Sequence, residues 1–154
     1  MAACKKKAIK QAKQPVDRKA AAERDPDQFY RQHPAWNFSS CDKELWSLNA
    51  AEARLLFWDE ILPRFQGLES QTWSDILVKA RKYNHSIYVT SLNKAATDRL
   101  IALKIEAESI ISLRITATHR VYGIMQDSVF NILWIDLDHG DNETCVCRSH
   151  KKHT

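Results

Sequence analysis

Arginine and histidine side chains that suit phosphate chemistry gather between residues 110 and 140. Arg114, His119 and Arg120 lie close together in the chain, and His139 follows the next hydrophobic run. A guanidinium group binds phosphate through paired hydrogen bonds, and a histidine accepts or donates protons near neutral pH. These four side chains therefore suit the binding of a phosphate and proton transfer beside it. Surface arginines on strands and histidines in turns are the plainer alternatives, and both stay open at this point.

Three short runs rich in β-branched and aromatic residues carry these groups. The first run ends in Leu113-Arg114-Ile115, the second spans residues 119–125, and the third spans residues 129–136. The turn Gln126-Asp127-Ser128 separates the last two runs, and a short turn between two β-rich runs indicates a hairpin. We expect an antiparallel meander that carries the arginines on or between adjacent strands.

A helical pattern stands well before the meander. Apolar residues at helical spacing predict a helix that begins after Asn49 and runs to Phe65. Asn49 and Glu52 have the spacing of a capping box. We expect Pro63 to interrupt a regular helix interior and Gly67 to end the element.

Two further helices and one more strand are predicted between this helix and the meander. The second, shorter helix starts at Thr72, and Ser91 or Asn93 caps the third. Between them, residues 85–90 form a β-like run that we expect to pair with the later sheet. Runs of helices followed by runs of strands are typical of α+β folds. We therefore predict an α+β fold in which N-terminal helices pack on a small antiparallel β-sheet.

Composition divides the chain into a basic segment and one domain. Residues 1–24 carry a net charge of +6, so the rest of the chain carries −2 of the overall +4. Pro26 and Pro34 are typical of a linker. We predict residues 1–35 as a basic tail and linker, helical or disordered, and residues 36–154 as a single domain. The tail either contacts RNA, DNA or the ribosome or serves as a solubilising segment.

The rest of the composition indicates in which cellular compartment we expect the protein. No apolar run approaches the about 18 residues that a membrane-spanning helix needs. The basic N-terminus lacks the apolar stretch of a secretory signal. The four cysteines, Cys4, Cys41, Cys145 and Cys147, form no disulfide framework in a chain of 154 residues. We expect a cytoplasmic protein without a membrane partner.

The order of these runs resembles the RelE/ParE toxin superfamily over residues 91–139. Cores of that superfamily end in a leucine–arginine strand, an arginine–valine–tyrosine strand, a tight hairpin, and a hydrophobic strand that runs into a histidine. Leu113-Arg114, Arg120-Val121-Tyr122 and His139 stand in the same order here. The resemblance implies a RelE-like fold and a small bacterial or phage toxin of a toxin–antitoxin pair. RelE-like members cut mRNA, often on the ribosome, whereas ParE-like members inhibit DNA gyrase.

The resemblance further implies an endoribonuclease that cleaves mRNA by 2′-hydroxyl attack, without a metal or another cofactor. Arg114 and Arg120 would hold the phosphate, and His139, His119 or His153 would transfer protons. The ribosome and an antitoxin protein would be further partners. Two alternatives stay open: a non-enzymatic toxin that binds a protein such as DNA gyrase, and an RNA-binding accessory module.

The C-terminal residues add further cations. In several toxins of this superfamily the C-terminal end contacts RNA, so we expect Arg148, Lys151 and Lys152 to bind RNA here. Tyr122 is a further candidate for RNA binding, with packing in the sheet as its alternative. A frayed basic tail is the alternative for the C-terminal cations.

Thiols and imidazoles in the same C-terminal residues raise the question of a metal. Cys145, Cys147, His150 and His153 are zinc-ligand types, but their spacing is not that of a standard zinc finger. We therefore expect no metal, although His139 could complete an irregular site.

Overall fold

The computed structural model of this chain describes residues 27–140 and 144–147, which form an α+β fold. The described elements, in chain order, are η1 (Gln28–Arg31), β1 (Ala35–Asn37), α1 (Ala51–Leu56), η2 (Phe57–Ile61), α2 (Leu62–Glu69), η3 (Asp75–Lys79), β2 (His85–Tyr88), η4 (Val89–Ser91), α3 (Lys94–Ala102), β3 (Ser109–Arg114), β4 (Arg120–Gln126) and β5 (Val129–Asp136).

One mixed sheet forms the centre of the fold, with the strand order β1-β5-β4-β3-β2. The predicted meander is confirmed, because β3 pairs antiparallel with β4 and β4 with β5. The run around residues 85–88 pairs antiparallel with β3, also as predicted. The prediction of a purely antiparallel sheet is wrong, since β1 runs parallel to β5 along its outer edge. Parallel pairing is possible there because the whole helical region separates the two strands in sequence.

The first predicted helix is longer than its sequence pattern indicates. Helical structure continues from Ala51 through α1, η2 and α2 to Glu69. Pro63 does not interrupt it, because η2 is a π-helical turn that pairs the Leu62 N–H with the Phe57 carbonyl just before the proline. Gly67 does not end it either. The N-cap is Ala50, which makes no side-chain cap hydrogen bond, so the predicted Asn49 cap is wrong.

The other two helical segments begin after the predicted capping residues, because residues 73–74 are already helical before η3 and α3 begins at Lys94, directly after Asn93. The Asp75 carboxylate accepts hydrogen bonds from the backbone N–H and the hydroxyl of Thr72, at 3.0 and 2.9 Å. Asn93 caps α3 by accepting the Ala95 N–H at 3.2 Å. The expectation that all helices precede the sheet is wrong, because α3 connects β2 to β3 and packs on the other face from α1 and α2.

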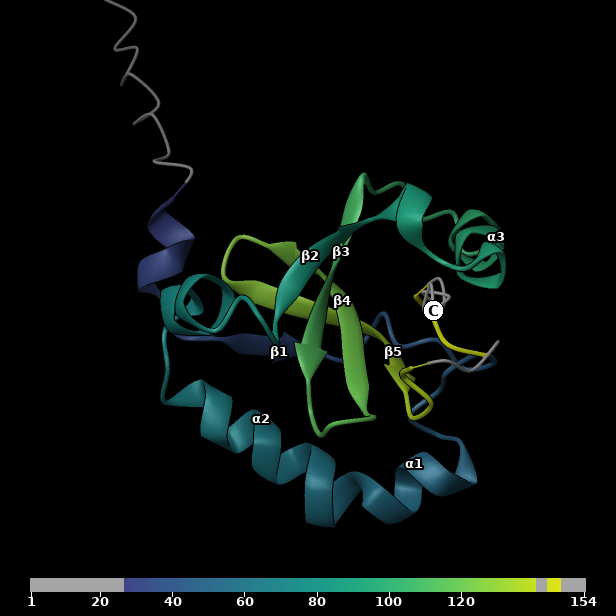
Figure 1. The fold of residues 1–154 in the computed structure, drawn as a ribbon, viewed down its shortest axis with the longest axis horizontal. Coiled ribbons are helices and arrows are strands. Elements are labelled where there is room, and N and C mark those ends of the chain that lie inside the picture. The colour runs from purple at the N-terminus through teal and green to yellow at the C-terminus, as the bar shows by residue number, and fades with distance from the viewer. Residues whose placement is uncertain (1–26, 141–143, 148–154) are drawn as a thin grey trace, which may run out of the picture.

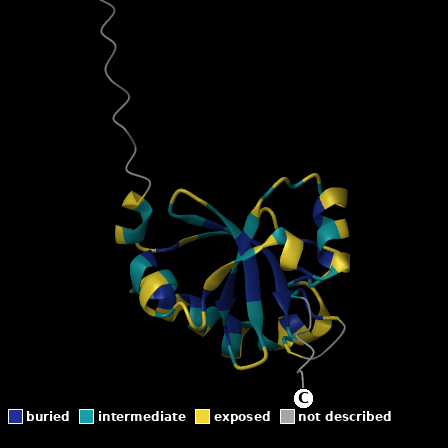
Figure 2. Cartoon of the chain, turned by 45° about the horizontal axis from the view of Figure 1, so that its top comes forward, coloured by how far each residue is buried: buried dark blue, intermediate teal, exposed yellow. Residues whose placement is uncertain are grey.

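Two separate cores cover the two faces of the sheet. The helix-side core packs α1, η2, α2 and η3 against one face, with Phe65, Trp73 and Phe130 at its centre. The α3-side core packs α3 and the segment 144–147 against the other face, around Tyr122 and Trp134. Figure 1 shows the sheet between the long helix and α3, and Figure 2 shows buried residues concentrated along the central strands. Within the described residues, no helix has the length and apolar character needed to cross a membrane.

Candidate functional site

Sheet register places the two predicted phosphate-binding arginines side by side. Arg114 at the end of β3 is the direct partner of Arg120 at the start of β4. Directly opposed residues of an antiparallel pair project from the same face of the sheet. Tyr122 lies two residues further along β4 and belongs to the α3-side core, so both arginines project from the α3 side.

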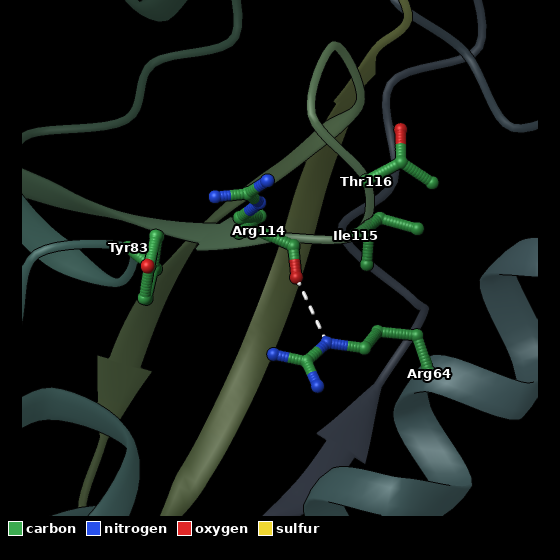
Figure 3. Close-up of a pocket in the computed structure, with 5 residues that line it drawn as sticks. All are labelled: Arg64, Tyr83, Arg114, Ile115 and Thr116. Atoms are coloured by element: carbon green, nitrogen blue, oxygen red, sulfur yellow. Dashed lines mark hydrogen bonds between the residues drawn. The ribbon is translucent and has the colours of Figure 1, made fainter. Parts of the chain in front are cut away.

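An open pocket of about 400 Å³ lies beside Arg114. Its lining consists of Arg64, Tyr83, Arg114, Ile115 and Thr116, and therefore contains two guanidinium groups and no carboxylate. The Arg114 guanidinium stacks on the Tyr83 ring, 4.7 Å from the ring centroid. Arg64 reaches from α2 around the end of the sheet and donates its Nε–H to the Arg114 carbonyl at 3.0 Å (Figure 3).

The arginines are close enough to influence one another electrostatically. Burial lowers the pKa of Arg64, and the nearby positive charge of Arg114 lowers it further. The same two causes, in the same order, lower the pKa of Arg120. Arginine stays charged despite such shifts, because its pKa starts above about 12. Arg64 and Arg114 together create a positive potential that attracts anions, whereas the Asp136 carboxylate, which pairs with Arg120 across β4 and β5, offsets part of the charge on that side.

Backbone contacts hold Arg114 and Arg120 in place. The buried Asn84 side chain accepts the Arg114 N–H at 2.9 Å and donates to the Ile76 carbonyl at 3.2 Å. Arg120 folds back over the turn between β3 and β4, where its guanidinium donates to the His119 carbonyl at 3.0 Å and to the Thr116 carbonyl. Arg114 therefore presents a freer guanidinium group than Arg120.

His119 and His139, the predicted proton-transfer histidines that the structure describes, do not line this pocket. His119 pairs with Glu60 of η2, with 2.9 Å between its Nδ1 and the carboxylate oxygen. Glu60 belongs to the long helix, so this contact draws His119 toward the helix side of the sheet. His139 lies on the α3 side, and its backbone N–H donates to the Thr118 carbonyl at 2.9 Å.

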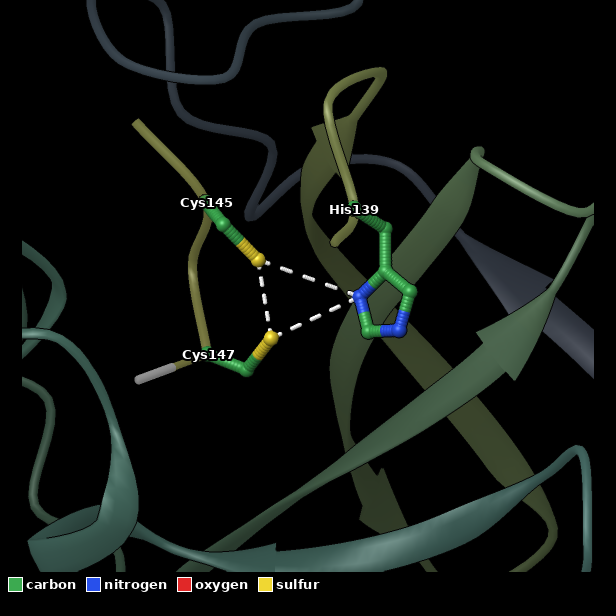
Figure 4. Close-up of side chains that lie close together, drawn as sticks. All are labelled: His139, Cys145 and Cys147. Carbon is green, nitrogen blue, oxygen red and sulfur yellow. Dashed lines mark hydrogen bonds between the residues drawn. The ribbon is translucent and has the colours of Figure 1, made fainter. Parts of the chain in front are cut away.

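His139 stands in a compact cluster with the two C-terminal cysteines. Its Nδ1 lies 3.5 Å from the Cys147 sulfur and 3.8 Å from the Cys145 sulfur, and the two sulfurs are 2.8 Å apart. Figure 4 shows Nδ1 facing both sulfurs while the other ring nitrogen faces away. These three side chains are the group among the described residues whose donor atoms lie close enough together to hold a metal ion.

The surroundings of the two thiols shift their pKa values in opposite directions. A hydrogen bond from Cys145 lowers the pKa of Cys147 to about 7. Burial acts in the opposite direction, and a hydrogen bond from the Tyr122 hydroxyl lowers the pKa further. The hydrogen bond between the two thiols and burial raise the pKa of Cys145 well above its usual range. Tyr122 itself is fully buried, and burial raises its pKa far above its usual range. Its hydroxyl lies 3.4 Å from the His139 Nδ1.

The remaining predicted site residues, Arg148, Lys151, Lys152 and His153, lie outside the described residues. Two pocket residues, Arg64 and Tyr83, were not predicted. Nothing in their spacing marks them, because Arg64 is fifty positions from Arg114 and only the fold brings them together.

Comparison of this chain with protein-family models, with curated proteins and with solved structures finds no significant match in any of the three.

Proposed function

We propose that this protein is a toxin-like endoribonuclease of the RelE type that holds an RNA phosphate in the pocket beside Arg114. One observation carries this proposal: two guanidinium groups and an aromatic ring converge on an open pocket whose lining contains no carboxylate. An anion is the ligand that such a pocket favours, and a phosphodiester presents an anion next to a stacking base.

Arg114 and Arg64 would share the phosphate between them. Arg114 is positioned by Asn84 and by the Tyr83 ring, so little side-chain entropy is lost when it binds. Positioned cations act mainly on the crowded, more negative transition state of phosphoryl transfer. Arg120, directly opposite Arg114, adds positive charge, but its guanidinium already donates to backbone carbonyls.

Proton transfer during the 2′-hydroxyl attack would fall to His139, His119 or His153. His139 has the better location of the two candidates that the structure describes, because it lies on the same face of the sheet as Arg114 and Arg120. His119 is engaged with Glu60. No metal takes part in the proposed reaction.

The RelE-like fold and the partners belong to the same proposal. The strands β3, β4 and β5 carry Leu113-Arg114, Arg120-Val121-Tyr122 and the run toward His139 in the order of the superfamily resemblance, which supports it. We propose mRNA as the substrate, on or off the ribosome, and an antitoxin protein as the inhibitor, for a bacterial or phage toxin that acts in the bacterial cytoplasm. RNA contacts of Arg148, Lys151 and Lys152 would extend the binding surface.

Sequencing of RNA 5′ ends after induction tests this function. The protein would be expressed in a bacterial host from a tightly repressed promoter, and cellular RNA sampled within minutes. We expect new cuts in translated mRNA that fall about 100-fold for Arg114→Ala, the loss typical of removing one transition-state hydrogen-bond donor. Arg81→Ala, which removes an exposed arginine outside the pocket, is the matched control and should cut like the wild type. Equal cutting by both variants would refute the pocket as the site.

A non-enzymatic toxin that binds a protein target is the second candidate. Leu55 and Trp58 are 78% and 72% exposed on the long helix, which is unusual for side chains of this size. Large apolar groups exposed one helical turn apart suit a protein partner. Growth arrest with intact RNA, lost in a Leu55→Ser/Trp58→Ser protein but kept in Arg114→Ala, would favour this candidate. An RNA-binding accessory role for residues 1–24 concerns residues outside those described.

A further inference from the structure

We propose that His139, Cys145 and Cys147 form a zinc site, with His139 binding through Nδ1 and both cysteines as thiolates. Thiolate and imidazole are the ligands that zinc prefers. The site shares His139 with the proposed RNA cleavage but does not rest on that proposal, and it would hold residues 144–147 against the α3 side of the sheet.

The geometry of the three donor atoms supports this assignment. Tetrahedral zinc, with bonds of about 2.3 Å to sulfur and about 2.0 Å to nitrogen, places a nitrogen and a sulfur roughly 3.6 Å apart. The Nδ1 of His139 lies 3.5 Å from one sulfur and 3.8 Å from the other. The two sulfurs are 2.8 Å apart, and zinc would move them to roughly 3.8 Å. Rotation about the side-chain bonds of Cys147, which lies at the surface end of the cluster, can supply that change.

The segment that carries the cysteines is held in place by contacts independent of any metal. Trp46 donates its indole N–H to the Thr144 carbonyl at 2.8 Å. The Val146 N–H donates to the buried carboxylate of Asp136 at 2.9 Å, and the Val146 carbonyl accepts the Asn93 N–H at 2.9 Å. These bonds attach residues 144–147 both to the end of β5 and to the start of α3.

A second set of contacts orients the ligands themselves. The Asn93 side chain donates to the Cys145 carbonyl at 3.2 Å, and Cys147 forms an isolated bridge with Leu92. The hydroxyl of Tyr122 lies 3.4 Å from the His139 Nδ1, where it can turn to donate to a thiolate once zinc occupies that nitrogen. Hydrogen bonds of this kind around the ligands strengthen and orient metal sites. Zinc therefore needs little rearrangement of the backbone.

Charge also favours a divalent ion here. Two thiolates and a neutral imidazole carry −2, which zinc neutralises, whereas two adjacent thiolates without a cation would repel each other. Three protein ligands leave one position of the tetrahedron for a water molecule or a further donor. Binding through Nδ1 would remove that atom of His139 from proton transfer, so the RNA chemistry would then rest on the other histidines.

Metal analysis of the purified full chain, prepared under reducing conditions, is the first test. We expect one zinc per chain, and cobalt substitution should give the visible and ultraviolet bands of tetrahedral coordination by thiolate. Zinc affinity, measured by competition with a chromogenic chelator, should fall on the order of 100-fold in Cys147→Ser and His139→Asn, because each loses one ligand. Cys41→Ser, which changes a cysteine outside the cluster, should keep the wild-type affinity.

Several results would overturn the site. Zinc below 0.1 per chain after supplementation would do so, as would an equal loss of affinity in Cys41→Ser and Cys147→Ser. A protein that holds no zinc, and whose proteolytic peptide containing both Cys145 and Cys147 is lighter by two hydrogens, would show a disulfide between these two cysteines instead. Circular dichroism of each variant checks that it folds. RNA cleavage by the variants is measured separately, because loss of cutting with intact zinc binding would concern the proposed function alone.

Discussion

The two faces of the sheet are built from different chemistry. On the helix side, aromatic rings dominate: Trp36 packs edge-on against Phe65, Trp73 and Phe130, with ring centroids 4.5 to 5.9 Å apart. On the α3 side, buried polar groups such as Asp42, Ser112 and Asp136 lie among the apolar residues.

The helix side contributes mainly to stability, and the α3 side carries most of the groups that could do chemistry. Apart from Arg64, Tyr83 and His119, every described candidate group projects from the α3 side, where a polar group has hydrogen-bond partners in the fold. A buried polar group is costly without such partners, so each one constrains the surrounding residues to a particular geometry. The helix side supplies mainly hydrophobic burial, and the indole N–H of its buried Trp73 has the Ser128 carbonyl as its partner.

The largest expected effect comes from the centre of the helix side. Trp73 is fully buried and donates its indole N–H to the Ser128 carbonyl at 2.8 Å. Trp73→Ala should lower the free energy of unfolding by about 4 kcal/mol, through lost burial and the cavity left behind. Urea denaturation followed by circular dichroism measures this. Trp58→Ala is the matched control, because Trp58 is 72% exposed and its loss should change stability by less than about 0.5 kcal/mol.

The buried ion pair of the α3 side should come second. Asp42 accepts from Arg99 of α3 at 2.7 and 2.8 Å and from the Trp134 indole at 3.1 Å. Asp42→Ala should cost about 3 kcal/mol, because Arg99 then loses its buried partner. The cost lies at the low end of the usual range since Arg99 keeps Glu44, 3.2 Å away. A loss below 1 kcal/mol would contradict the view that polar contacts anchor this side.

The same carboxylate predicts a dependence on pH. Burial raises the pKa of Asp42, but hydrogen bonds from the Arg99 side chain, the Glu44 backbone N–H and the Trp134 indole outweigh burial and hold that pKa well below its usual range. Because the folded-state pKa is lower than the unfolded value of about 3.9, the stabilisation is complete above that value and is lost as the pH falls toward the folded-state pKa. The stability difference between wild type and Asp42→Ala should therefore shrink below about pH 4. An unchanged difference down to about pH 2 would contradict this.

A further prediction compares glycines in a strand and in a helix. A Cβ added to Gly123 of β4 would lie 2.7 Å from the Phe130 ring and closer still to the Asn131 backbone oxygen. Gly123→Ala should therefore lower stability by about 2 kcal/mol through overpacking. Gly67 of α2 has no atom within 4 Å of an added Cβ. Gly67→Ala should raise stability by about 1 kcal/mol, because alanine favours the helix. Thermal unfolding would rank the two, and destabilisation by both would show that Gly67 has a packing role.

The smallest effect should lie on the outer surface of α3. Asp98 pairs with Lys94 at 2.8 Å, but both side chains are more than half exposed. Asp98→Ala should change the free energy of unfolding by less than about 0.5 kcal/mol, since water and salt screen this pair. Comparison with Asp42→Ala in the same urea series shows whether burial decides how much a carboxylate on the α3 side contributes to the free energy of unfolding.

Much of the local structure could be predicted from the sequence. The strands around Arg114, Arg120 and residues 129–136 follow from β-rich runs and a short turn, because those signals are local. The capping interaction between Thr72 and Asp75 could be predicted from the sequence in the same way. Strand β1 was missed, since the three residues between Pro34 and Phe38 are too few to carry a periodic signal. The course of the helix through Pro63 was missed because a π-helical turn has no sequence signature.

By itself, the sequence determined the α+β class and the antiparallel meander, because local propensity suffices for these. The direct pairing of Arg114 with Arg120 depends on the strand register, which only the structure shows. Only the tertiary structure decided that Arg64 joins Arg114 in one pocket and that His139 meets Cys145 and Cys147. These contacts depend on where long-range packing and hydrogen bonds hold α2 and the segment 144–147. No spacing along the chain encodes those distances.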